Sequence, residues 1–267
     1  MKSNSTMIQE KKATIDALSF YYKLVGDPQN PSLVFLHGHP MPDLPAERFD
    51  YSNVLLELAK YFYVIAPEHI GTMRSDPPQK PISKEERAEV IHKLLESLKI
   101  RTPIMMGQSF GGGVALVYAH LYPQKVKTLI LVDAVTDYRK RTYFILGAIR
   151  YWLYKSLFAL PLSLDFKRNL VYWSSKRAKL PESDLRKYLN QLHPINYVIN
   201  VDYLRLKTPT ILVWGKNDWF ITPVSDAYRL KRKIKGSRLV LVDGGHTILY
   251  QDPEYVVGEI VKSLNLL

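Results

Sequence analysis

The residue of this chain with the clearest chemical potential is Ser109, which lies in the pentapeptide Gly107-Gln108-Ser109-Phe110-Gly111. The apolar residues 103–106 predict a buried strand before it, and residues 112–119 predict a helix after it. A strand that turns directly into a helix holds the serine at a strained corner, with its hydroxyl above the sheet and a helix N-terminus behind it. The flanking glycines fit this corner, because a Cβ at either position would collide with the neighbouring strand or helix. The pattern predicts a nucleophilic serine.

Two further residues suited to this chemistry follow later predicted strands. Residues 210–215 predict a buried strand that runs into Asp218, and residues 238–243 predict another that is followed by Gly244, Gly245 and His246. A histidine can remove the serine proton during attack on an acyl carbonyl, and an aspartate can hold the imidazole in the required tautomer. We therefore expect Ser109, Asp218 and His246 to form a catalytic triad.

The order serine, acid, histidine, with each residue just past a strand, resembles the α/β-hydrolase superfamily of serine esterases and their relatives. The resemblance covers residues 30–135 and 205–265 and implies an α/β-hydrolase fold, with a mostly parallel central sheet flanked by helices. It also implies two main-chain N–H groups that bind the oxyanion, those of His39 and Phe110. His39 belongs to a His-Gly-His-Pro turn after a predicted strand at residues 32–36, and Phe110 directly follows the nucleophile.

Several assignments in this site have alternatives. The pair His37 and His39 could suggest a metal, but no further ligand follows at a suitable spacing and the chain has no cysteine, so we expect neither a metal nor a cofactor. Asp218 could instead cap the turn that follows it, and Asp133 occupies a position that some superfamily members use for the acid. Arg74, near the expected pocket edge, is expected to face water rather than substrate.

The composition narrows the class of protein. The chain has 267 residues, 46% of them hydrophobic, which is enough for one large domain or a domain with an insertion. No run of about 18 apolar residues predicts a membrane span, and the polar first dozen residues show no secretory signal. Without cysteine there are no disulfides and no thiol chemistry, which favours a cytoplasmic protein.

The net charge of +12 is concentrated in residues 136–200, which carry twelve Lys and Arg against four Asp and Glu. The same segment holds twelve of the 31 aromatic residues and lies where the superfamily usually inserts a cap over the active site. We therefore expect a core formed by residues 1–135 and 201–267, with a helical cap at 136–200. This cap could face an anionic substrate or a membrane surface, or be an ordinary solvated lid. No nucleic-acid-binding motif is present, and the oligomeric state stays open.

The leading functional hypothesis is hydrolysis of a carboxylic ester or thioester of a small to medium acyl substrate, through an acyl-enzyme on Ser109. One alternative is C–C bond hydrolysis of a dienoic diketone acid, since those enzymes share the triad and often show a Ser-x-Gly-Gly motif like the one at residues 109–112. A second alternative is a non-catalytic ligand or membrane-surface binder on the same fold. The serine excludes dehalogenases and epoxide hydrolases that use an aspartate nucleophile.

Overall fold

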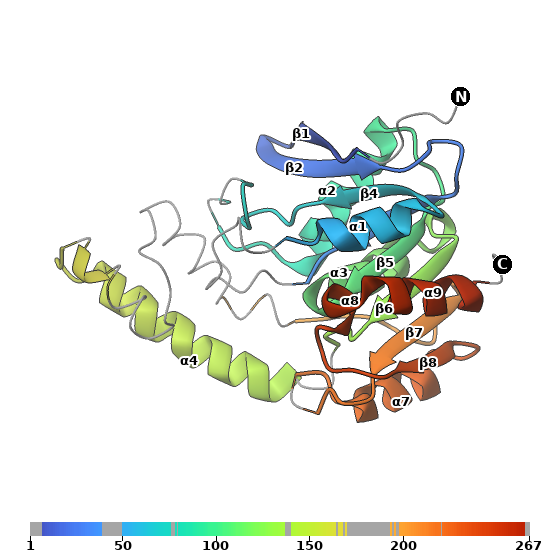
Figure 1. The fold of residues 1–267 in the computed structure, drawn as a ribbon. Coiled ribbons are helices and arrows are strands. Elements are labelled where there is room, and N and C mark those ends of the chain that lie inside the picture. Colours follow the sequence, from blue (N-terminus) through green and yellow to red (C-terminus); the bar gives the residue numbers. More distant parts are fainter. Residues whose placement is uncertain are drawn as a thin grey trace.

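The centre of the molecule is an eight-stranded sheet with the strand order β1-β2-β4-β3-β5-β6-β7-β8 (Figure 1). The pairs β1–β2 and β2–β4 are antiparallel, and every other neighbouring pair is parallel. The strands are β1 (Gln9–Ile15), β2 (Leu18–Val25), β3 (Ser32–Leu36), β4 (Tyr63–Pro67), β5 (Ile104–Gln108), β6 (Thr128–Val132), β7 (Thr210–Gly215) and β8 (Arg238–Val242). The computed structural model describes residues 7–38, 50–75, 78, 80–136, 140–163, 165–167, 169, 193, 195, 198–219 and 221–264.

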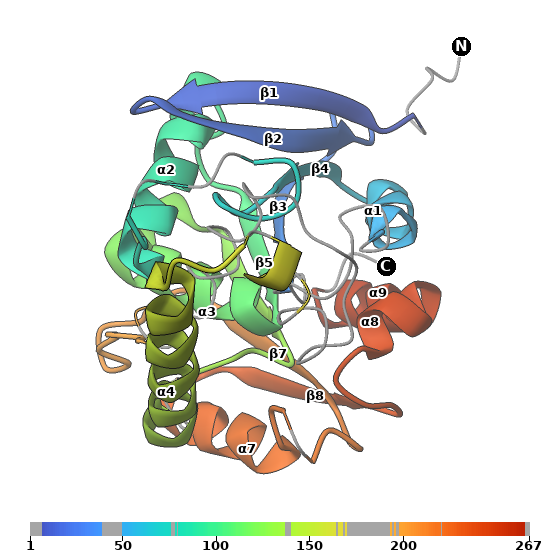
Figure 2. The same ribbon diagram turned by 90° about the vertical axis from the view of Figure 1, so that its left-hand side faces the viewer.

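Strands β3 to β7 are buried on both faces, in keeping with their continuous apolar sequences, whereas the edge strand β8 is only partly buried. In β3, Val34 and Leu36 pack on one face of the sheet, whereas Leu33 and Phe35 pack on the other. Helices α2, α3 and α7 cover the first face, and α1, α8 and α9 cover the second (Figure 2). The helices are α1 (Ser52–Ala59), α2 (Lys84–Ser97), α3 (Ser109–Leu121), α4 (Lys140–Ala159), α7 (Val224–Lys233), α8 (Ile248–Gln251) and α9 (Pro253–Ser263).

The start of α2 is fixed by a capping box. The hydroxyl of Ser83 accepts the main-chain N–H of Glu86 at 3.1 Å, and the Glu86 carboxylate accepts the N–H of Ser83 at 2.7 Å. This exchange satisfies two N–H groups that the helix itself leaves unpaired. The boundary of α2 is therefore set locally, by two residues three positions apart.

Helix α4 is the first element of the expected cap, and it extends away from the sheet (Figure 1). It ends at Ala159, two residues before Pro161, because a proline disfavours helical backbone in the residue before it. Residues 170–192 of the expected cap lie outside the described residues, so a complete cap stays a prediction. Among the described helices, none has both the length and the apolar character needed to cross a bilayer.

Candidate active site

Ser109 occupies the sharp turn between β5 and α3. Its φ of +51° lies in the left-handed region, which is strained for a residue with a side chain. The flanking glycines permit the turn, since a Cβ on Gly107 would collide with the main-chain oxygen of Gly111, and a Cβ on Gly111 with that of Leu36 on β3. Because β5 lies between β3 and β6, the turn is at the middle of the edge where the parallel strands have their carboxyl ends.

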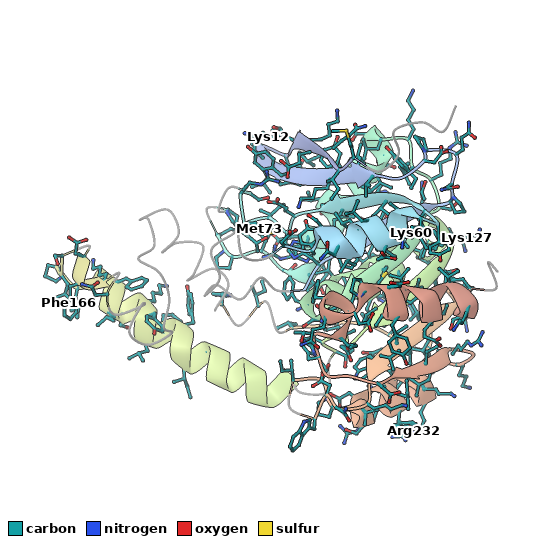
Figure 3. The ribbon with its side chains drawn as sticks, viewed as in Figure 1. Lys12, Lys60, Met73, Lys127, Phe166 and Arg232 are labelled. Atoms are coloured by element: carbon teal, nitrogen blue, oxygen red, sulfur yellow. The ribbon has the colours of Figure 1, made fainter. Side chains whose placement is uncertain are left out.

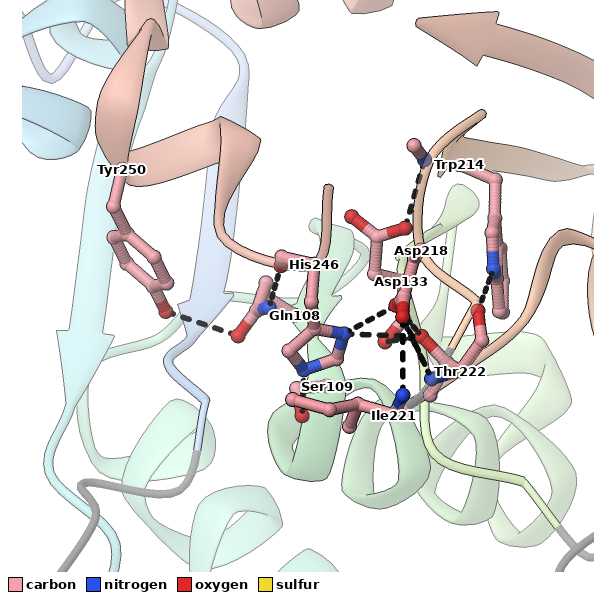
Figure 4. Close-up of polar contacts among 10 residues, drawn as sticks. Gln108, Ser109, Asp133, Trp214, Asp218, Ile221, Thr222, His246 and Tyr250 are labelled. Carbon is pink, nitrogen blue, oxygen red and sulfur yellow. Dashed lines mark hydrogen bonds and ion pairs between the residues drawn. The ribbon is translucent and has the colours of Figure 1, made fainter. Parts of the chain in front are cut away.

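His246 lies between Ser109 and Asp218 (Figure 4). Its Nε2 is 2.9 Å from the Ser109 Oγ, and its Nδ1 is 2.6 Å from the Asp218 Oδ2. When Nδ1–H is donated to the carboxylate, the lone pair of Nε2 faces the serine hydroxyl. The structure thus brings the three predicted residues together in hydrogen-bonding order, which is the arrangement that base-assisted attack by a serine requires.

The carboxylate of Asp218 is held by the loop that follows it. The main-chain N–H groups of Ile221 and Thr222 donate to it, each at 3.1 Å, and the Thr222 hydroxyl donates at 2.6 Å. Trp214 fixes this loop in turn, because its Nε1–H donates to the main-chain oxygen of Thr222 at 2.6 Å. Burial alone would raise the pKa of Asp218, but hydrogen bonds from His246 and Thr222 outweigh burial and hold the pKa below its ordinary value. Asp218 therefore caps its own loop and also contacts the imidazole of His246.

Asp133, the alternative acid, has a different partner. Its Oδ1 accepts the main-chain N–H of Gly215 at 2.8 Å, and its buried Oδ2 has no hydrogen-bond partner in the part of the chain that the structure describes. Burial raises the pKa of Asp133 well above its ordinary value, and the nearby Asp218 raises it further, although the Gly215 N–H acts in the opposite direction. This environment favours a protonated Asp133 that joins β6 to β7, whereas His246 contacts Asp218.

Of the two expected oxyanion donors, Phe110 is described and His39 is not. Phe110 directly follows Ser109 in the first turn of α3, where main-chain N–H groups point out of the helix. An anion beside Ser109 would therefore meet the positive end of this helix. His39 lies outside the described residues, so its role stays a prediction.

His37 supports the turn that precedes His39. Its Nδ1 is 2.6 Å from the main-chain oxygen of Gly38, and its Nε2 accepts the main-chain N–H of His69 at 3.2 Å. Burial lowers the pKa of His37 to about 4, although the hydrogen bond to Gly38 acts in the opposite direction. The ring is thus neutral near pH 7, and both of its nitrogens form hydrogen bonds within the protein.

Two residues that the sequence did not single out, Gln108 and Tyr250, connect the loops of the site. The side-chain nitrogen of Gln108 donates to the main-chain oxygen of His246 at 3.0 Å, and its side-chain oxygen accepts the Tyr250 hydroxyl at 3.2 Å. The same hydroxyl accepts the main-chain N–H of Gly38 at 3.0 Å. The sequence places both residues near expected triad members, Gln108 before Ser109 and Tyr250 four positions after His246, but it does not indicate that they contact one another.

The loop after β4 corrects one expectation. Arg74 does not simply face water: its Nε and Nη2 both contact the buried Glu68 carboxylate, at 3.2 and 2.9 Å, and its Nη1 contacts Glu10 at 2.8 Å. Met73 has a φ of +47°, a conformation that favours glycine. Ion pairs from Arg74 therefore help to hold this loop in place.

Comparison with known proteins gives the family of the chain. Residues 31–253 match the family described as alpha/beta hydrolase fold. The monoacylglycerol lipase ABHD6 of Homo sapiens is 27% identical over 273 residues, which cover 92% of this chain and 79% of that protein. Epoxide hydrolase 4 of Mus musculus is 26% identical over 277 residues, which cover 91% of this chain and 75% of that protein.

Solved structures agree on the fold. The 2-hydroxy-6-oxo-6-phenylhexa-2,4-dienoate hydrolase from Rhodococcus sp. strain RHA1 is similar with a TM-score of 0.70 and 22% sequence identity, over 97% of this chain and 99% of that chain. The enol-lactonase from Burkholderia xenovorans LB400 is similar with a TM-score of 0.71 and 16% identity, over 96% of this chain and 100% of that chain. At these identities the likeness concerns the fold alone.

Proposed function

Because the chain belongs to the alpha/beta hydrolase fold family, we propose that it is a serine hydrolase that cleaves a carboxylic ester or thioester of small to medium size. The observation that supports this proposal most directly is the hydrogen-bonded path from Ser109 through His246 to Asp218. The similarity to a protein named monoacylglycerol lipase supports an ester as the bond that is cleaved.

In the proposed reaction, His246 Nε2 takes the proton of Ser109 while the serine oxygen attacks the carbonyl carbon of the ester. The carbonyl oxygen becomes an oxyanion, which the main-chain N–H of Phe110 would stabilise together with that of His39. Asp218 accepts the Nδ1–H and stabilises the positive imidazole. Collapse of the intermediate expels the alcohol or thiol, which takes the proton from His246, and the acyl group stays on Ser109.

Hydrolysis of the acyl-enzyme uses the same groups in the same order. His246 removes a proton from water, the resulting hydroxide attacks the acyl carbon, and Ser109 leaves with the proton from the imidazole. The low pKa of Asp218 suits both half-reactions, because an ionised carboxylate stabilises the imidazolium each time it forms.

Labelling with a fluorophosphonate tests the proposal without knowledge of the substrate. We expect the wild-type protein to be labelled and the Ser109→Ala variant to be unlabelled and inactive on aryl acetates, with an unchanged thermal transition. A matched control is Ser52→Ala, which replaces another helix-terminal serine far from the triad in sequence. Labelling that survives in Ser109→Ala would move the nucleophile to another residue.

A second candidate reaction is C–C bond hydrolysis of a dienoic diketone acid. It is supported by the Ser-x-Gly-Gly sequence at residues 109–112, in which Gly112 has no room for a Cβ because Ala134 lies against it. Assays on aryl acetates and thioesters beside a ring-fission product would separate the two. Turnover of the ring-fission product alone would replace the ester proposal with this one.

A further inference from the structure

Helix α4 presents apolar side chains to solvent along one side. Ile149, Trp152 and Leu153 expose 60%, 58% and 64% of their surface. The spacing i, i+3, i+4 places all three on the same side of a helix, and Leu160, 50% exposed just beyond the helix end, continues that side about three turns from Ile149. These four residues are called the α4 stripe below.

The other side of α4 is already packed. Tyr151 and Tyr154 are buried, and their rings contact His193 and Phe158 at centroid distances of 4.6 and 5.8 Å. A surface helix normally turns its one apolar side to the protein and a polar side to water. Helix α4 has apolar residues on both sides, and an exposed apolar patch of this kind marks an interaction surface.

Basic groups lie beside the stripe. The Lys155 Nζ is 4.7 Å from the ring of Trp152 and 5.6 Å from that of Tyr151. Beyond the helix, Phe166 is half exposed at the far end of the projection (Figure 3), and the Nζ of Lys167 donates to the main-chain oxygen of Phe158 at 2.7 Å. Residues 136–200 together carry eight more positive than negative charges. The described part of this surface therefore combines exposed apolar and aromatic side chains with Lys155, within a segment whose sequence carries a positive net charge.

We propose that the α4 stripe docks on the surface of an anionic lipid bilayer. Trp152 and Leu153 would enter the boundary between headgroups and acyl chains, and Lys155 beside them would contact lipid phosphates. Tryptophan next to a long basic side chain suits this boundary, because the ring is amphipathic and the lysine stem is apolar up to its charge.

Charge favours the bilayer over a second copy of the chain. A symmetric dimer through the α4 stripe would bring two copies of α4 together, each within a segment whose sequence has eight surplus positive charges. An anionic bilayer instead supplies the opposite charge along the whole of this surface. Delivery of acyl esters from the bilayer to Ser109 would follow, a consequence that rests on the proposed function, whereas binding to vesicles does not.

Cosedimentation with vesicles tests the proposal. The full chain carrying Ser109→Ala, which separates binding from turnover, is mixed with vesicles of phosphatidylcholine alone or of phosphatidylcholine with phosphatidylglycerol. We expect binding to the anionic vesicles at low salt, weaker binding at high salt because ions screen the charges, and little binding to phosphatidylcholine alone. Replacing the two central stripe residues, by Trp152→Ser with Leu153→Ser, should lower the partition coefficient about tenfold or more.

The matched control replaces two exposed hydrophobic residues elsewhere, Leu121→Ser on α3 with Tyr228→Ser on α7, which are 43% and 47% exposed. This control should bind vesicles as strongly as the parent, and thermal melts should show that both double variants fold. Absence of binding at low salt, retention of binding by the stripe variant, or equal loss in the control would each overturn the proposal. So would sedimentation analysis that shows a dimer which only the stripe variant loses.

Discussion

The side chain of Gln108 donates a hydrogen bond to the main-chain oxygen of His246 at 3.0 Å, so the residue before the proposed nucleophile holds the residue proposed as its base. Through Tyr250 the same side chain also reaches the main-chain N–H of Gly38, next to the expected oxyanion donor. One buried amide therefore positions the nucleophile turn, the histidine loop and the turn before His39 relative to one another.

Gln108→Met keeps most of the side-chain volume and removes both hydrogen bonds. We expect kcat to fall about tenfold with little change in KM, because a loss of about 1 to 1.5 kcal/mol in positioning acts on the transition state rather than on substrate binding. Gln251→Met, at an exposed neighbour of Tyr250, is the control and should leave kcat unchanged. Equal kcat values for Gln108→Met and the parent on an aryl acetate would exclude this positioning role.

The carboxyl groups of Asp218 and Asp133, both near β7, should contribute differently to kcat. Asp218→Asn leaves an amide beside His246 Nδ1 and favours the wrong tautomer, so kcat should fall by about 10⁴. Asp133→Asn keeps an oxygen for the Gly215 N–H and should change kcat by less than about threefold, since Asp133 does not contact His246. The opposite pattern of losses would assign the acid to the end of β6.

The same Asp133→Asn variant should change how stability depends on pH. The folded protein holds the Asp133 proton to higher pH than the unfolded chain, which releases it near pH 4. As pH rises above that point, ionisation of Asp133 stabilises the unfolded state, so the free energy of unfolding of the wild type falls. The fall ends when the carboxyl group also ionises in the folded protein. Urea unfolding at several pH values should show the variant gaining stability relative to wild type as pH rises above about 4.

The control for this pH effect is Asp243→Asn, at an exposed carboxylate that pairs with Lys216 at 2.7 Å. The difference in free energy of unfolding between Asp243→Asn and the wild type should not increase with pH as it does for Asp133→Asn. A stability difference for Asp133→Asn that is the same at every pH would mean that the substitution acts through packing and not through the buried proton.

Two glycine-to-alanine substitutions should change the free energy of unfolding in opposite directions. In Gly111→Ala the new methyl group would meet the main-chain oxygens of Leu36 and His37, so the free energy of unfolding should fall by about 3 kcal/mol or more. In Gly258→Ala, on α9, nothing lies within contact distance of the new methyl group, and stability should rise by about 0.5 to 1 kcal/mol. Denaturant titration measures both values, and a tolerated Gly111→Ala would contradict the close packing of β3 on α3.

Features fixed by residues close in sequence were predictable. The capping box of Ser83 and Glu86 spans three positions, and the strained turn at Ser109 follows from a strand that runs directly into a helix. The order of strands along the chain, with a polar residue after each, was enough to place Asp218 and His246 at the same edge of the sheet as Ser109. In each case the local pattern and the sheet topology determine the geometry without further information.

Contacts between distant segments that belong to no recognisable motif were not predictable. Gln108 and Tyr250 are 142 positions apart, and neither shows by residue type alone that it has a partner. In the loop after β4, only the fold reveals that Arg74 reaches Glu68 and Glu10. Such pairs depend on how loops approach one another after the sheet has formed, which a single sequence does not encode.

The order of the strands along the chain determines when Ser109 can become reactive during folding. Ser109 and β6 precede α4 in the chain, whereas Asp218 and His246 follow β7 and β8. The proposed triad can therefore form only after β7 has paired with β6 across the long intervening segment and β8 has paired with β7. Non-local pairing of this kind is slow compared with helix formation, so in a refolding reaction helical structure should appear before Ser109 becomes reactive. Reactivity of the serine thus reports that the last parallel strand has joined the sheet.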